Sequence, residues 1–186
     1  MNNIQIKKIA IMATLVALMA ATRSHHFDSL SNLPDASLAA FMLAGIYLPF
    51  AAFPALLVVA GVSDYFALNY GGVSDWCFST AYWFLIPTYA ALWYAGRFYA
   101  ARHNLSWRGL SLFTATAVLA SSAAFMISSG SFFLFSGRFD DMSALHYAAS
   151  VAKYFVPYLI SAVLYLSIAV CVQIGAANFS RRSAHA

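Results

Sequence analysis

Cys77 is the residue best suited to covalent or metal chemistry, because a thiolate is both a nucleophile and a soft metal ligand. It stands at the start of an apolar stretch, residues 77–97, that we expect to be a helix. The positive end of a helix dipole at that position stabilises a thiolate. The alternative is that Cys77 is a small buried apolar residue, which is a common role of a free cysteine.

Two adjacent histidines, His25 and His26, offer imidazole nitrogens, which bind many transition metals. On a helix their side chains would point roughly 100° apart, so both could hold one ion only from a loop. No second histidine pair at i, i+4 spacing accompanies them. The pair is therefore a candidate set of metal ligands. The alternative is that both are ordinary loop residues.

Asp64 is the carboxylate whose position most needs an explanation, because it lies near the end of the apolar stretch 50–68. An ionised group there is costly unless it faces water, a partner or a ligand. Asp35 follows Pro34 just before another apolar stretch, where aspartate typically caps a helix. We therefore expect Asp35 to be a cap and Asp64 to be a candidate functional residue.

The elements that position these residues are predicted to be membrane helices. The chain has 186 residues, of which 62% are apolar and 9% charged, whereas a soluble domain is about half apolar and about a quarter charged. Its net charge of +4 is spread along the chain without a basic stripe. This distribution argues against a nucleic-acid partner.

A helix needs about 20 apolar residues to cross the hydrocarbon layer of a membrane, which is about 30 Å thick. The apolar run 36–68 contains Pro49 and Pro54. As one helix it would be about 50 Å long, and proline interrupts helices, so we split it into two. The sequence predicts a single all-α membrane domain with six transmembrane helices at about residues 5–22, 36–48, 50–68, 77–97, 109–128 and 145–176.

The positive charges favour this count, because Lys and Arg concentrate in cytoplasmic segments. Six crossings with both termini in the cytoplasm place seven basic residues inside and only Arg23, Arg138 and Lys153 outside. Five crossings, which cleavage of the first stretch as a secretory signal would leave, give a weaker bias. The outer segments 22–35, 69–76 and 128–145 then hold most of the polar residues.

Several short motifs resemble the BtuM family. Its members are small bacterial cobalamin transporters related to the substrate-binding S-components of energy-coupling-factor (ECF) transporters. The resemblance extends over most of the chain, from the first predicted helix to the fourth. The residues that carry it are Arg23-Ser24-His25-His26-Phe27, Leu33-Pro34-Asp35-Ala36-Ser37, Phe41-x-Leu43-Ala44-Gly45-x-Tyr47-Leu48, and Cys77 ahead of Ala81-Tyr82.

The resemblance implies an ECF S-component-like bundle in the bacterial cytoplasmic membrane, with a cobalamin site at its outer end. It implies that Cys77 is the axial ligand of cobalt, with His25 or His26 as the rival. A second hypothesis follows from this ligation, namely that the thiolate assists removal of cyanide from cyanocobalamin. Aromatic residues also gather at membrane interfaces without any ligand. The other residues expected to contact the corrin ring or its amides are Asp64, Tyr65, Asn69, Tyr70, Asp75, Trp76, Tyr82, Arg138, Phe139 and Tyr147.

The energy for transport is expected to come from other proteins. The sequence contains no ATP-binding loop of the form Gly-x-x-x-x-Gly-Lys-Ser/Thr, and S-components dock on a coupling subunit that works with ATPases. Ala13, Ala17 and Ala21 form a stripe of small residues that would let another helix approach closely. Packing against the protein's own helices is the alternative use of this stripe. The sequence does not decide whether a dedicated coupling module is used.

Two other functional classes stay open. One is an S-component or solitary transporter for another vitamin or a metal. The other is a membrane enzyme with Cys77 as its nucleophile, which would need a general base such as His25 or His146 beside the thiol.

Overall fold

The computed structural model describes residues 2–23, 34–70, 79–104 and 106–183, which form six α-helices, one short 3-10 helix and no β-strand. The elements are α1 (Asn3–Arg23), α2 (Ser37–Tyr47), α3 (Ala52–Tyr70), η2 (Thr80–Phe84), α4 (Leu85–Ala100), α5 (Trp107–Phe135) and α6 (Ala144–Ser183). The chain is therefore all-α, as the composition predicts.

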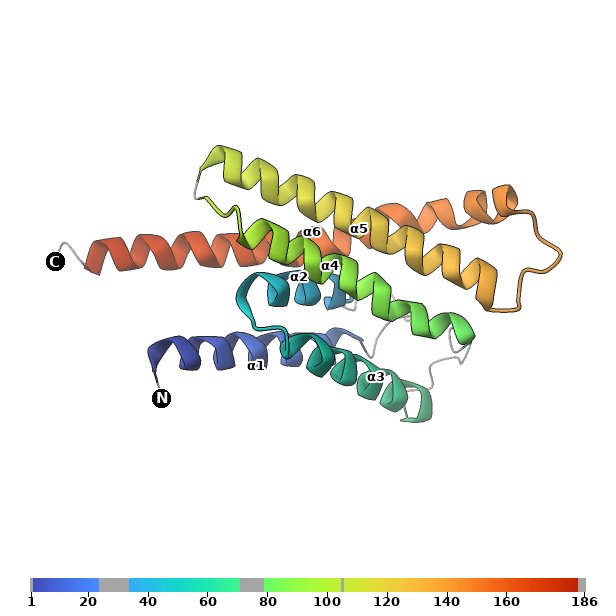
Figure 1. Cartoon of the computed structure of the whole chain (residues 1–186), viewed down its shortest axis with the longest axis horizontal. Helices are drawn as coiled ribbons and strands as arrows, with labels where there is room; N and C mark the ends of the chain where they lie inside the picture. Colours follow the sequence, from blue (N-terminus) through green and yellow to red (C-terminus); the bar gives the residue numbers. More distant parts are fainter. Residues whose placement is uncertain (1, 24–33, 71–78, 105, 184–186) are drawn as a thin grey trace.

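The helices lie side by side and alternate in direction along the bundle (Figure 1). Helices α1, α3 and α5 run one way, and α2, α4 and α6 run back, so α1 begins and α6 finishes at the same end of the molecule. We call this the terminal end. The opposite end, where α3 and α5 finish and α6 begins, is called the cavity end.

Four helices are long and apolar enough to cross a membrane, namely α1, α3, α5 and the 144–176 part of α6. Helix α2 is apolar but shorter. The outer surface of the bundle carries large apolar side chains such as Val58, Leu119 and Ile168, all of them exposed. Such a surface suits lipid, and these features indicate a multi-pass membrane protein.

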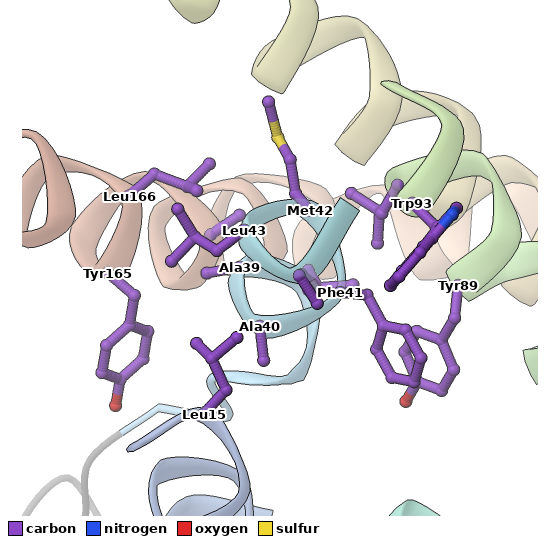
Figure 2. Close-up of a cluster of buried hydrophobic side chains, with 14 of the residues drawn as sticks. Leu15, Ala39, Ala40, Phe41, Met42, Leu43, Tyr89, Trp93, Tyr165 and Leu166 are labelled. Carbon is purple, nitrogen blue, oxygen red and sulfur yellow. The ribbon is translucent and has the colours of Figure 1, made fainter. Parts of the chain in front are cut away.

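Helix α2 is the centre of the core. Its residues from Ser37 to Gly45 are all buried, as expected for a helix that is apolar on every side. Phe41 stacks on Tyr89 of α4 with 4.2 Å between the ring centroids. Figure 2 shows α2 surrounded by buried side chains from α1, α4 and α6, including Leu15, Trp93 and Leu166.

Two glycines allow α2 and α4 to pack closely. A Cβ atom at Gly45 would collide with the backbone carbonyl of Trp93, and one at Gly96 would collide with that of Met42. Small residues permit this approach because nothing projects between the two backbones. The crossing fixes α4, and with it Tyr89, against the start of α2.

The chain breaks between α2 and α3 near the prolines, as expected, whereas α5 continues through serines that were expected to form a loop. Helix α2 ends at Tyr47, and α3 begins at Ala52 with Pro54 in its first turn, where a missing N–H removes no helical hydrogen bond. Helix α5 runs to Phe135, seven residues beyond the expected end, through a segment whose serines resemble a loop. Ser131 instead donates its hydroxyl proton to the carbonyl of Ser128 within the helix.

Two other segments differ from the expected spans. The predicted helix 77–97 is a 3-10 turn, Thr80–Phe84, followed by an α-helix from Leu85 to Ala100. Ser79 starts the turn by accepting a hydrogen bond from the backbone N–H of Ala81. The last helix is longer than expected, because it continues to Ser183.

The small-residue stripe of α1 does not pack inside the protein. Ala13, Ala17 and Ala21 are all exposed, whereas α1 turns Leu15 and Met19 into the core. The internal-packing alternative is therefore wrong, and the stripe faces outward.

Candidate functional site

A cavity of about 810 Å³ lies at the cavity end of the bundle. Its lining comes from the ends of α1 and α3, the start of α2, η2, the first turns of α4, the second half of α5 and the first half of α6. Small-molecule sites typically have volumes of about 300–1,000 Å³. The cavity therefore has the size of a ligand site, and every described helix contributes to it.

The side of the cavity formed by α1–α4 is organised by one guanidinium group. Arg23, the last residue of α1, is 4% exposed and forms a two-pronged ion pair with Asp64 of α3. Its Nε donates to Oδ1 at 2.6 Å, and its second terminal nitrogen donates to Oδ2 at 2.8 Å. Paired N–H donors of this kind are the strongest geometry for an arginine and a carboxylate.

The other terminal nitrogen of Arg23 reaches two hydroxyls. It donates to Ser37 Oγ at 2.9 Å and to Tyr89 Oη at 2.6 Å. Tyr82 of η2 then donates its hydroxyl proton to Asp64 Oδ2 at 2.7 Å. We call the set Arg23, Ser37, Asp64, Tyr82 and Tyr89 the ionic wall; it joins α1, α2, α3, η2 and α4.

Asp35 closes the ionic wall from the start of α2. Its Oδ1 accepts hydrogen bonds from the backbone N–H of Ser37 at 3.0 Å and from the Ser37 hydroxyl at 2.7 Å. Its Oδ2 lies 3.9 Å from the Nη1 atom of Arg23. Asp35 thus satisfies a free N–H at the first turn of α2, which is what a cap does, and it also adds negative charge beside Arg23.

The opposite side of the cavity is built by α5, α6 and the connection between them. Tyr147 donates its hydroxyl proton to the carbonyl of Ser129 on α5 at 2.9 Å. Phe139 packs on the Tyr147 ring with 4.8 Å between centroids. We call this side the aromatic wall, and its cavity-lining rings are Phe125, Phe132, Phe139, Tyr147, Tyr154 and Tyr158.

Four of the residues expected to contact a ligand line the cavity, namely Asp64, Tyr82, Phe139 and Tyr147. The structure brings them together from α3, η2, the connection 136–143 and α6. Asp64 was expected to need water, a partner or a ligand, and its partner is Arg23.

Other expected contact residues do not line the cavity. Tyr65 and Tyr70 on α3 are 57% and 77% exposed, and Asn69 bonds to the carbonyl of Tyr65 within its own helix. Arg138 lies with Asp140 and Asp141 in a separate, more open hollow of about 620 Å³. These residues lie on the last turns of α3 or on the connection after α5, where their side chains are directed away from the bundle interior.

The remaining candidates fall outside the described residues. They are Cys77, Asp75, Trp76, His25 and His26. In sequence, Cys77 precedes Tyr82 by five residues and His25 follows Arg23 by two. Both therefore adjoin, along the chain, residues of the ionic wall.

Sequence reasoning missed Arg23 and Tyr89 as site residues. Arg23 was counted only as one of the three basic residues on the outer side, although it ends an apolar stretch just as Asp64 does. In a bundle of alternating helices, the end of the first helix and the end of the third lie at the same end. Opposite charges at those two positions are the signal that predicts the ion pair.

The described residues contain no group of three His, Cys, Asp or Glu side chains that could hold a metal ion. The described cavity offers carboxylates, a guanidinium, hydroxyls and aromatic rings. Groups of these kinds can hold a ligand through hydrogen bonds and ring contacts.

No family model matches the chain, and no curated protein matches it.

Proposed function

We propose that the chain is a transporter subunit that takes up cobalamin across the bacterial cytoplasmic membrane. The observation that carries the proposal is the cavity, which combines a charge-paired ionic wall with an aromatic wall inside an apolar helical bundle. Ligand sites between the helices of a membrane bundle are typical of transporters, and ionisable groups at such depth typically mark a substrate path.

The resemblance to the BtuM family supports cobalamin as the ligand. Cobalamin has a broad corrin ring, which suits the aromatic wall, and amide side chains, which suit hydroxyls and carboxylates. It is larger than a drug-sized molecule, so it would fill the cavity and extend through its mouth. In this proposal Cys77 binds the cobalt, because it precedes Tyr82 of the ionic wall so closely in sequence.

The same proposal includes six crossings with both termini in the cytoplasm. The helices alternate in direction (Figure 1), so if all six cross the membrane, both termini lie on the same side of it. Seven of the ten basic residues then face the cytoplasm. The cavity end is the outer end in this orientation.

Cobalamin titration by calorimetry, with absorption spectra, tests the proposal. We expect the wild type to bind cobalamin with a shift in its visible spectrum. We expect Cys77→Ala to weaken binding and lose that shift, because the cobalt loses its thiolate. The matched control is Cys171→Ala, since Cys171 is exposed on α6 well beyond the helical residues that line the cavity. A wild type that binds no cobalamin contradicts the function, and an unchanged spectrum in Cys77→Ala contradicts the ligation.

A thiolate on one face of cobalt would also labilise the ligand on the other face. We therefore include thiol-assisted removal of cyanide from cyanocobalamin in the proposal. It predicts slow loss of bound cyanide under reducing conditions in the wild type and in Cys171→Ala, and retention of cyanide in Cys77→Ala.

The exposed stripe Ala13, Ala17 and Ala21 supports docking of a helix from an ECF-type coupling subunit. Lipid could equally cover such a surface. Docking predicts that the coupling subunit co-purifies with the wild type and that this co-purification is lost in Ala17→Leu, whereas a lipid-facing stripe predicts no co-purification. The proposal holds with or without a dedicated module.

One observation favours a second candidate, a transporter for a smaller vitamin. The cavity of about 810 Å³ would enclose such a ligand completely. A colourless purified protein that carries a bound organic vitamin and does not bind cobalamin would decide for this alternative.

A further inference from the structure

The hydroxyls of the cavity tyrosines differ in whether the protein already satisfies them. Tyr82 donates to Asp64, Tyr89 accepts from Arg23, and Tyr147 donates to the carbonyl of Ser129. Tyr154 and Tyr158 also line the cavity, yet neither hydroxyl has a hydrogen-bond partner among the described residues. These two hydroxyls are free to meet something inside the cavity.

Exposure separates the two. Tyr154 is 57% exposed, so it lies at the surface of the bundle rather than inside it. Tyr158 is mostly buried and packs against the core. Among the described residues, the unpaired polar side-chain atoms sealed from solvent are Ser121 Oγ and Ser136 Oγ. The Tyr158 hydroxyl is not sealed, so it opens into the cavity that its ring lines.

Packing fixes the direction of the Tyr158 ring. Phe125 of α5 meets it edge to face, with 5.4 Å between centroids. Phe125 is held in turn by Phe155 of α6 at 5.2 Å. A hydroxyl on a ring held in this way is an oriented hydrogen-bonding group rather than a mobile one.

Pro157, the residue before Tyr158, supplies a second polar group on the same wall. It lies inside α6 and lines the cavity. Proline has no N–H, so the carbonyl four residues earlier, that of Lys153, lacks its helical donor. Lys153 also lines the cavity. One turn of α6 therefore combines a cavity-lining hydroxyl that can donate with a carbonyl that has no N–H donor four residues later.

We propose that Tyr158 and the Lys153 carbonyl, freed by Pro157, form a subsite for a neutral carboxamide of the ligand. A carboxamide has one carbonyl acceptor and an NH₂ donor, which match the hydroxyl and the free carbonyl. The subsite rests on the proposed function, because the amide side chains of cobalamin are the groups that would occupy it. It assigns ligand recognition to α6, in which the sequence motifs indicate no binding residue beyond Tyr147.

Tyr158→Phe tests the hydroxyl, because it keeps the ring and its contact with Phe125. We expect cobalamin affinity, measured by calorimetry, to fall by about three- to tenfold, the range of one lost hydrogen bond. Tyr154→Phe is the matched control, and we expect its affinity to stay within about twofold of the wild type. The ligand-free variants should unfold at the wild-type temperature, since neither hydroxyl has a protein partner.

Pro157→Ala tests the carbonyl by restoring the missing N–H. We expect a higher unfolding temperature for the ligand-free protein, because a helical hydrogen bond is gained, together with weaker cobalamin binding. A gain in stability with a loss of affinity cannot come from partial misfolding.

An analogue tests the nature of the ligand group. A corrinoid whose amides are replaced by methyl esters lacks the NH₂ donor, so it should bind the wild type more weakly. We expect that difference between the two ligands to shrink in Pro157→Ala, in which the Lys153 carbonyl is already taken.

The outcomes separate the two proposals. If the wild type binds no corrinoid, the proposed function is wrong and the subsite falls with it. If the wild type binds cobalamin but Tyr158→Phe binds it equally well, the subsite alone is wrong. Equal losses for amide and ester ligands in Pro157→Ala also overturn the carboxamide assignment.

Discussion

The two walls of the cavity use their polar groups in opposite ways. In the ionic wall the groups bind one another: Arg23 pairs with Asp64, and Tyr82 and Tyr89 complete the set. In the aromatic wall, the Tyr158 hydroxyl has no described protein partner, and the Lys153 carbonyl lacks its helical donor because residue 157 is proline. The ionic wall therefore joins the helices to one another, and the aromatic wall is the one that leaves groups open for the ligand we propose.

The comparison teaches that polarity in a membrane bundle is not by itself a sign of ligand contact. A buried ion pair costs desolvation free energy, and it persists because removing one partner costs more. An unpaired hydroxyl open to a cavity has no such structural reason. If this division is right, substitutions in the ionic wall should affect mainly folding, and those in the aromatic wall mainly binding.

The largest effect is expected for Asp64→Asn. It leaves the buried Arg23 without its main counter-charge, and breaking a buried pair in this way costs about 3–5 kcal/mol. Equilibrium unfolding of the ligand-free protein in mixed micelles measures the loss. Asp141→Asn is the control, because Asp141 is exposed on the connection after α5 and should change stability by less than about 0.5 kcal/mol.

The double variant Arg23→Met with Asp64→Leu sharpens this test. It removes both charges, so it should recover a large part of the stability that Asp64→Asn loses. If Asp64→Asn is as stable as Asp141→Asn, the ion pair does not hold the bundle and the division between the walls fails.

An intermediate effect is expected for Gly45→Ala. The added methyl group would meet the Trp93 carbonyl and push α2 away from α4, at a cost of about 1–3 kcal/mol for overpacking. Gly61→Ala is the matched control, since a Cβ there meets nothing within 4 Å and alanine favours a helix by up to about 1 kcal/mol over glycine. Opposite signs for the two variants in the same unfolding measurement confirm the close crossing; equal effects contradict it.

The smallest effect is expected for Tyr147→Phe, which removes the one described hydrogen bond between α5 and α6 on the aromatic wall. We expect a loss of about 1 kcal/mol in unfolding free energy. Tyr154→Phe, with no protein partner to lose, should stay within about 0.5 kcal/mol of the wild type. A loss as large as that of Asp64→Asn would mean that the aromatic wall is also a structural element.

Much of the fold follows from features that are local in sequence. Apolar runs and Pro49 with Pro54 are enough to separate α2 from α3, because proline acts within one turn of its own position. The need of Asp64 for a partner was also predictable, since the cost of burying a charge depends on the apolar residues around it.

The site was harder to predict, because it depends on which residues meet across helices. Tyr65, Asn69 and Tyr70 are as polar as Tyr82, and only the rotation of α3 decides that they lie away from the cavity. Tyr158 looks like any tyrosine of an apolar helix, and its role depends on the partners it lacks. The serines after residue 127 were misleading because the helix continues through them, and Ser131 bonds to a carbonyl of that same helix.

The length of α2 has a consequence for the energetics of the transport that we propose. With eleven residues it spans only about 16 Å, roughly half of the hydrocarbon thickness. Its first residue touches Arg23, which is also the last residue of the 21-residue α1, so in a membrane the ionic wall lies between mid-depth and the cavity-end surface. The full membrane potential is worth about 2.3 kcal/mol per charge at 100 mV, so a singly charged ligand would gain or lose at most about half of that on reaching this wall from the cavity end. A neutral ligand makes the same journey without electrical work, and its occupancy of the cavity is independent of voltage.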